Sequence, residues 1–247
     1  MYHIAFVMID FLDNIDTSLL LALNSLHCGF FDNFMSVATG RYVWIPFYMA
    51  VAFMLFHYHG WRKALVWTAM IAMAVALADQ TCATLIRPQV ARMRPANELN
   101  PISPLVHVVN GYRGGMYGFP SCHGSNSLAL VMMVCLVIRR KRVWLLMGSW
   151  ALLNVYTRIY LGVHYPGDIL IGTVIGCISA VIFYSIGCKA VSRLNLPYVD
   201  RHSLSFLFPT AMHPNGAIGM TRIRMAICMV PISVLVVTIV TIALLSI

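Results

Sequence analysis

Three short clusters organise this sequence: Arg87-Pro-Gln-Val-Ala-Arg-Met-Arg94-Pro95, then Pro120-Ser121-Cys122-His123, then Thr157-Arg158 followed at fixed spacing by His164 and Asp168. Each cluster supplies a group that phosphoryl transfer needs. Arginine offers forked donors that match phosphate oxygens, and histidine can attack or pass a proton near neutral pH. A carboxylate can hold a histidine in one tautomer. No cluster of metal-ligating residues accompanies them, so the arginines would have to neutralise the phosphate, and we expect neither a metal nor a cofactor.

The composition is that of a membrane protein. The 247-residue chain is 60% hydrophobic and only 10% charged, whereas a soluble globular chain carries about 25% charged residues. The formal net charge of +9 comes from basic residues in the connections between apolar runs, so we expect no nucleic-acid partner. The seven cysteines are an odd number without metal-like spacing, which is typical of small buried side chains.

Apolar runs recur along the chain, several of them close to the roughly 20 residues that cross a bilayer. They predict about six transmembrane helices, at residues 42–61, 64–86, 123–138, 143–156, 166–188 and 225–247. A polar segment at 189–223 connects the last two. We therefore expect an all-α fold: a polytopic membrane helix bundle that forms a single domain over residues 1–247.

The first 40 residues are amphipathic rather than spanning. Apolar residues recur at helical spacing with polar residues between them; the apolar set is Leu12, Ile15, Leu19, Leu20 and Leu23, and the polar set is Asp13, Asp16 and Asn24. This pattern predicts an N-terminal amphipathic interfacial helix that lies along the membrane. A packed cap over the bundle is the alternative.

Two polar features interrupt the apolar runs. Asp79 is the single charge of the second predicted span, and an intramembrane carboxylate is functional by default. We expect it to pair with one of the motif arginines; the alternative is a structural hydrogen bond to a neighbouring helix. Residues 87–119 form a polar loop, and loops of this length in a compact bundle are usually functional.

The basic residues predict the orientation in the membrane. The connections at 62–63, 139–142 and 189–224 carry 11 lysines and arginines, and the opposite side carries six. The positive-inside rule places the first set in the cytoplasm and the motif loops outside. All three clusters then fall on one side of the membrane, as a shared site requires.

The spacing Arg-x6-Arg-Pro, Pro-Ser-x-His and Arg-x5-His-x3-Asp resembles the type 2 phosphatidic acid phosphatase (PAP2) superfamily, which also contains the vanadium haloperoxidases. The resemblance covers about residues 80–170. The family usually has Lys where Arg87 stands, Gly where Cys122 stands and Ser where Thr157 stands. Arg87 keeps the charge and Thr157 keeps a hydroxyl. We interpret Cys122 as a tolerated variant of a glycine whose backbone N–H, rather than its sulfur, faces the phosphate.

The resemblance implies a role for each motif residue. His164 is the expected nucleophile, forming a phosphohistidine, and Asp168 is expected to fix its tautomer. His123 is the expected general acid, which then activates water. The expected phosphate-binding set is Arg87, Arg94, Arg158, Ser121, Cys122 and Gly124.

Together these features predict a membrane-embedded, metal-independent lipid phosphatase. A site where a span meets the outer aqueous face suits a phosphate head group whose tail lies between helices. Undecaprenyl diphosphate, lipid A and phosphatidylglycerol phosphate stay open as substrates, and the oligomeric state is not indicated. The expected location is a bacterial inner membrane, with the active site facing the periplasm or cell exterior.

Three other functions are alternatives to the lipid phosphatase. A lipid-to-lipid phosphotransferase would use the same site and the same phosphohistidine. A non-catalytic transporter would carry paired charges within several spans, and here the spans carry almost none. A haloperoxidase is disfavoured because those proteins are soluble.

Overall fold

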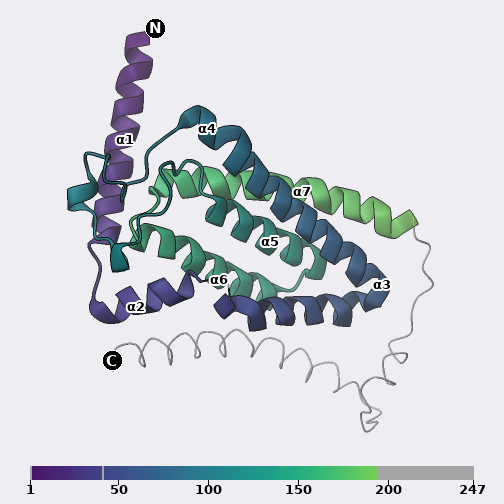
Figure 1. Cartoon of the computed structure of the whole chain (residues 1–247). Helices are drawn as coiled ribbons and strands as arrows, with labels where there is room; N and C mark the ends of the chain where they lie inside the picture. Colours follow the sequence, from purple (N-terminus) through teal and green to yellow (C-terminus); the bar gives the residue numbers. More distant parts are fainter. Residues whose placement is uncertain (1, 41, 194–247) are drawn as a thin grey trace.

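The computed structural model describes residues 2–40 and 42–193, and in this part of the chain the long elements are all helices, which confirms the all-α prediction. In chain order they are α1 (Tyr2–Asn24), α2 (Gly29–Ala38), α3 (Ile45–Gln80), α4 (Arg87–Val90), α5 (Cys122–Ile138), α6 (Lys141–Tyr160) and α7 (Pro166–Arg193). Short turns of other helix types lie at Tyr42–Trp44, Thr81–Ile86, Ser103–Leu105 and Val109–Gly111. Helices α3, α5, α6 and α7 form the bundle, as Figure 1 shows.

Helix α3 consists of two arms that are joined by a sharp turn. Gly60 has φ 70° and ψ 163° inside it, a conformation that glycine adopts without steric cost. Figure 1 shows the two arms meeting at the far end of the bundle. They correspond to the predicted spans at 42–61 and 64–86. The second arm continues through a π-helical turn into α4 and ends beside the first motif.

The remaining predicted spans in the described region are also helices. Helix α5 starts one residue before the predicted 123–138, α7 starts at the predicted Pro166, and α6 extends past residue 156, so that Arg158 is helical. By length and composition, two helical segments of the described residues could cross a membrane, Tyr42–Val90 and α7; α5 is a shorter apolar helix. The predicted sixth span at 225–247, and all of 189–223 beyond residue 193, lie outside the described residues.

Small residues bring α5 and α7 into close contact. A Cβ added at Gly172 would overlap the carbonyl oxygen of Ser121, and one at Gly176 would overlap that of Ser125. Paired small residues four positions apart allow helix backbones to approach in this way. The packing brings the first turns of the two helices together, and the Ser121 N–H donates to the Asp168 carbonyl oxygen at 3.0 Å. Two of the motifs are thereby joined at one end of the bundle.

The basic connection at residues 139–142 lies at the other end of the bundle. Nη2 of Arg139 donates to the Tyr184 hydroxyl at 2.6 Å, and the Arg140 guanidinium lies 5.9 Å from the ring centre of Tyr58, close to the turn in α3. The 17 residues of α5 separate this connection from the motifs by about 25 Å. The three motifs and the basic connection therefore occupy opposite ends, as the predicted topology requires.

The N-terminal 40 residues form two helices, and α1 runs across the end of the bundle where α7 begins (Figure 1). The predicted apolar stripe of α1 is split between two faces. Leu20 and Asn24 are buried, whereas Leu12, Ile15 and Leu19 are 60%, 47% and 46% exposed. The inner face is therefore a packed cap, the alternative considered from the sequence. Contact of the outer face with a membrane stays a prediction.

Candidate active site

His164 lies in the turn between α6 and α7, almost completely buried at 2% exposure. Its Nδ1 is 3.3 Å from Oδ2 of Asp168, and the same carboxylate oxygen accepts the N–H of Tyr165 at 3.1 Å. Helix α7 begins at Pro166, so a spacing of four residues places the carboxylate in the first helical turn, within reach of the ring. The structure thus brings together the pair that the resemblance implies.

Arg94 fixes which imidazole nitrogen carries the lone pair. Its Nη1 lies 3.2 Å from Nε2 of His164. A guanidinium has only donors, so Nε2 accepts this bond and the proton resides on Nδ1, facing Asp168. Backbone carbonyls hold Arg94 in place, with Nε bonded to Tyr117 at 3.1 Å and Nη1 to Val163 at 3.3 Å. The assigned tautomer leaves Nε2 as the nucleophilic atom.

Three arginines act electrostatically on the His164 ring, and Arg94 is the one in contact with Nε2. Burial lowers the pKa of His164 well below its ordinary value, and the nearby Arg94, Arg158 and Arg87 lower it further. Burial, with Arg158 and Arg87, also lowers the pKa of Arg94 to about 10. Arg94 therefore stays protonated at neutral pH while His164 stays neutral. The result is a buried cationic site around an uncharged imidazole.

Arg87 and Arg158 belong to different helices, α4 and α6. Nη2 of Arg87 donates to the Pro120 carbonyl at 2.8 Å and to Sγ of Cys122 at 2.9 Å. Nη1 of Arg158 donates to Oγ1 of Thr39 at 2.5 Å. Within the described residues, Nε of each arginine is buried without a hydrogen-bond acceptor. Buried donors are normally paired, so both groups are suited to bind an anion.

The contact between Arg87 and the sulfur of Cys122 was not foreseen. The sequence reading gave position 122 only a backbone role, whereas the structure places its side chain on a phosphate-binding candidate. The side chain of Thr39 was likewise missed. It belongs to the C-cap of α2 and lies 119 residues from Arg158, and no sequence motif marks it.

The start of α5 supplies the second motif. Oγ of Ser121 accepts the N–H of Gly124 at 3.4 Å as the helix N-cap, and Ser121 is fully buried. Gly124 packs against Ile169 of α7, where a Cβ would lie 3.1 Å from the carbonyl oxygen. These contacts are structural, so phosphate binding by Ser121 and Gly124 stays a prediction. His123 is half-buried, directly after the cysteine that contacts Arg87; its acid role also stays a prediction.

A glycine-rich loop covers the site. A Cβ at Gly118 would lie 3.2 Å from Oδ2 of Asp168 and 3.4 Å from Nδ1 of His164, and Gly114, at φ +68°, lies against Arg94. The loop is tied down by bonds of 2.9 Å from Gly118 N–H to the Arg92 carbonyl and 3.0 Å from Arg94 N–H to that of Met116. The density of glycine in residues 111–118 was the available signal for this close approach.

Asp79 does not pair with an arginine of the motifs. Its Oδ1 accepts a hydrogen bond from Nδ2 of Asn126 at 2.8 Å, which joins α3 to α5. The expected arginine pairing was therefore wrong, and the alternative of a structural bond to a neighbouring helix is the one observed. Close to the site, Arg92 instead pairs with Asp168, at 2.9 Å, and the sequence patterns do not predict this role for Arg92.

Comparison with known proteins identifies the family of the chain. Residues 69–191 match the model of the PAP2 superfamily. The chain is 44% identical over 187 residues to the lipid A 4'-phosphatase of Bacteroides thetaiotaomicron, covering 76% of this chain and 83% of that protein. It is 30% identical over 184 residues to that of Porphyromonas gingivalis, covering 74% and 78%.

The fold has a counterpart among solved structures. The crystal structure of Aquifex aeolicus LpxE superposes with a TM-score of 0.51 at 21% identity, covering 68% of this chain and 94% of that one. An identity this low supports the fold alone. The motifs, their convergence around His164 and the two relatives together lead to one conclusion: the chain belongs to the PAP2 superfamily and is a PAP2-type phosphatase.

Proposed function

We propose that this protein is a membrane lipid phosphatase. It hydrolyses a phosphate monoester of a glycolipid of the lipid A type through a phosphohistidine intermediate. The observation that carries the proposal is the contact of Arg94 with Nε2 of His164 at 3.2 Å, with Arg87 and Arg158 close enough to act electrostatically on the same ring. The substrate class is supported by the names of the two relatives described above. Undecaprenyl diphosphate and phosphatidylglycerol phosphate are the competing substrates.

In the first step, Nε2 of His164 attacks phosphorus in line with the sugar oxygen. The N–P bond forms as the P–O bond to the sugar breaks, and His123 gives its proton to the departing oxygen. Asp168 stabilises the imidazolium character that develops on the ring, because it accepts the Nδ1–H. The arginines stabilise the charge on the three equatorial oxygens of the transition state.

In the second step, His123 takes a proton from water, and the water oxygen attacks phosphorus. The N–P bond breaks, inorganic phosphate leaves, and His164 returns to its neutral form. The low pKa of His164 favours this return, since burial and the three arginines disfavour a charged ring. No step requires a metal ion, because the guanidinium groups supply the positive charge.

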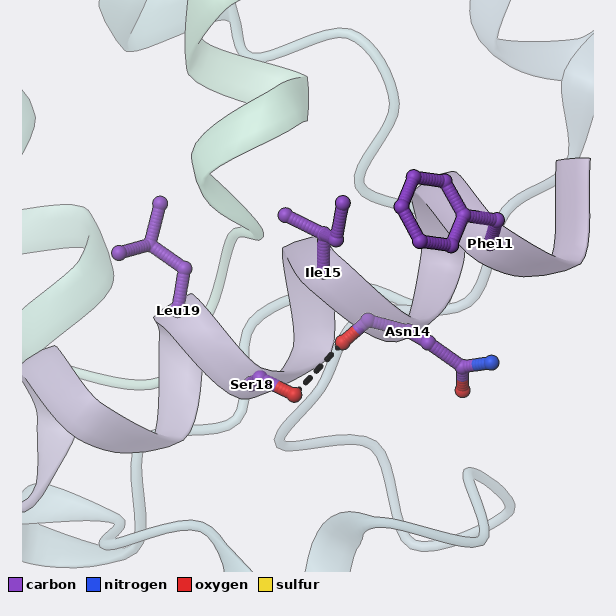
Figure 2. Close-up of a pocket in the computed structure, with 5 residues that line it drawn as sticks. All are labelled: Phe11, Asn14, Ile15, Ser18 and Leu19. Atoms are coloured by element: carbon purple, nitrogen blue, oxygen red, sulfur yellow. Dashed lines mark hydrogen bonds between the residues drawn. The ribbon is translucent and has the colours of Figure 1, made fainter. Parts of the chain in front are cut away.

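Helix α1 is suited to contact the bilayer. Figure 2 shows Phe11, Ile15 and Leu19 projecting from one side of α1, where they line a shallow groove with Asn14 and Ser18. These three apolar residues are between 46% and 64% exposed. Because α1 crosses the end of a bundle that contains two candidate spans, we assign this face to the acyl chains of the outer leaflet. The proposed location is a bacterial inner membrane with the site facing the periplasm.

The decisive experiment measures phosphate release by the purified protein from a panel of lipids. Lipid A carrying only a 4'-phosphate is compared with the 1-phosphate isomer, undecaprenyl diphosphate and phosphatidylglycerol phosphate, with His164→Asn as the inactive control. We expect release from the 4'-phosphate to exceed that from the other three lipids. Preference for another lipid would overturn the substrate assignment. Appearance of a phosphorylated acceptor lipid without free phosphate would identify a phosphotransferase.

A further inference from the structure

Arg92 differs from the other arginines of the site, because its guanidinium donates hydrogen bonds to three carboxylates. Nη1 donates to Oδ1 of Asp168 at 2.9 Å and to Oδ2 of Asp16 at 2.7 Å, and Nη2 donates to Oδ1 of Asp13 at 2.8 Å. The guanidinium also lies 3.8 Å from the ring centre of Tyr165. With its donors used in this way, Arg92 is directed at the protein and not at a phosphate.

Asp16 makes a second contact, with the start of α7. Its Oδ1 accepts the N–H of Gly167 at 2.7 Å. The first N–H groups of a helix have no partner within the helix, and an acceptor there also interacts favourably with the helix dipole. A Cβ at Gly167 would lie 2.6 Å from Oδ2 of Asp16. Helix α1 therefore caps α7 from outside, at the residue directly before Asp168.

The two oxygens of Asp168 have separate partners. Oδ2 faces Nδ1 of His164 and the N–H of Tyr165, and Oδ1 faces Arg92. Asp168 is only 1% exposed. A buried carboxylate without a compensating cation is costly, and it tends to take up a proton instead. Arg92 therefore orients this carboxylate and favours its charged form.

We propose that Asp16 and Arg92 are positioning residues for the reaction, through which α1 sets the orientation of the Asp168–His164 pair. This inference rests on the proposed role of His164 as nucleophile. It assigns a catalytic contribution to the N-terminal helix, which lies outside all three motifs. The acidic face of α1 acts on the site, whereas its opposite face carries the exposed apolar residues.

The test compares Asp16→Asn with Asp13→Asn. Both residues lie on α1 and both bind Arg92, but the Asp13 side chain is 63% exposed, and its hydrogen bond is to Nη2 of Arg92 rather than to Gly167 or Asp168. We expect Asp16→Asn to lower kcat about 10- to 100-fold, as loss of an outer partner does at metal-bound histidines. KM should stay within about 3-fold, since the phosphate-binding arginines are untouched. Asp13→Asn should change kcat less than about 2-fold, as exposed ion pairs contribute little.

Gly167→Ala is the second variant, and it decides the question if Asp16→Asn does not fold. It should displace Asp16 while leaving every charge in place, so it should also lower kcat and not KM. The ¹⁵N spectrum of His164 should show in either variant a changed balance between the Nδ1–H form and other forms. A purely structural role would lower the melting temperature and leave this signal unchanged.

Labelling of wild-type His164 with radioactive phosphate is measured first. This measurement separates failure of the phosphohistidine mechanism from failure of the role proposed for α1. Absence of label would overturn the phosphohistidine mechanism, and this inference with it. Label in the wild type, together with full turnover in Asp16→Asn and Gly167→Ala, would overturn only the role of α1. Equal losses in Asp13→Asn and Asp16→Asn would also overturn it, because they would reflect general charge rather than the geometry at Asp168.

Discussion

Nη2 of Arg87 donates a hydrogen bond to the sulfur of Cys122 at 2.9 Å, and so a thiol orients one of the arginines that face the nucleophile. Most members of the PAP2 superfamily have glycine at this position and cannot make such a contact. The remaining anchor of Arg87 is the carbonyl oxygen of Pro120, at 2.8 Å. Each of these two hydrogen bonds alone can hold the Arg87 guanidinium near the start of α5. The thiol therefore adjusts the position of the guanidinium and is not needed to keep it there.

The first prediction concerns this contact. Cys122→Gly should retain turnover, because the backbone N–H remains and the family tolerates glycine. KM should rise about 3- to 10-fold, corresponding to the loss of one hydrogen bond to a charged donor with partial compensation by Pro120. Cys122→Ser keeps an acceptor and serves as the matched control, with KM close to that of the wild type. Loss of turnover in folded Cys122→Gly would show that the thiol has a chemical role.

The second prediction separates the two histidines by the step at which they fail. His164→Ala should form no phosphoenzyme with any substrate. His123→Ala should still be phosphorylated by a nitrophenyl phosphate, whose leaving group needs no proton, and its breakdown should slow by about 10²- to 10⁴-fold. Rapid quench with radiolabelled phosphate measures both. An acid-labile adduct in His164→Ala would show that the nucleophile is the other histidine.

The third prediction is that activity needs no metal. Arg87, Arg94 and Arg158 already supply three cations that act on His164, so EDTA should leave turnover unchanged. Vanadate should inhibit, as a trigonal-bipyramidal mimic of the transition state. Turnover that is lost in EDTA and restored by Mg²⁺ would contradict an arginine-based mechanism.

The fourth prediction concerns protonation of the nucleophile. Because burial and the three arginines lower the pKa of His164, the ring should remain neutral when the pH falls to the ordinary histidine pKa of about 6.5. The ¹⁵N shifts of His164, assigned with His164→Ala, measure this directly. Arg158→Met removes one of the cations and should raise the pKa, whereas Arg139→Met at the opposite end of the bundle should not. A wild-type midpoint at or above the ordinary value would contradict the buried cationic site.

The fifth prediction places the site outside the cytoplasm. In a cysteine-free background, a cysteine at Gly115 should react with a membrane-impermeant thiol reagent in intact spheroplasts, and one at Lys141 only after the membrane is broken. Gly115 is preferred to Gly114, since a side chain at Gly114 would meet Arg94. The reverse labelling pattern would place the motifs in the cytoplasm and the substrate in the inner leaflet.

Local patterns in the sequence predicted much of the bundle and part of the site. Long apolar runs marked α5, α6 and α7, and the turn in α3 falls at Gly60, near the end of the first of the two runs that form this helix. The spacing of His164 and Asp168 anticipated their contact, because a carboxylate in the first turn of α7 is within reach of a ring two residues before the helix. These features depend on neighbours in the chain, which a single sequence displays.

The supporting contacts could not be read in the same way. The periodicity of residues 1–40 places Asp16 and Asn24 on the polar side of an amphipathic helix, yet they bind Arg92 and the carbonyl of Tyr160, respectively. Periodicity separates polar from apolar faces but does not say which face meets the protein. The bond from Arg158 to Thr39 joins residues 119 apart, and its existence depends on how α2 packs on α6.

The anchors of the three arginines also bear on the order of folding. Arg87, Arg94 and Arg158 are held by residues 35, 70 and 119 positions away, on α5, in the turn before α7 and at the end of α2. Closing long loops is slow because chain entropy is lost before the contacts form. The site formed by these three arginines and His164 should therefore be among the last parts of the chain to assemble. Binding of vanadate then reports a completely folded bundle, and a partly folded chain that already contains its helices should not bind it.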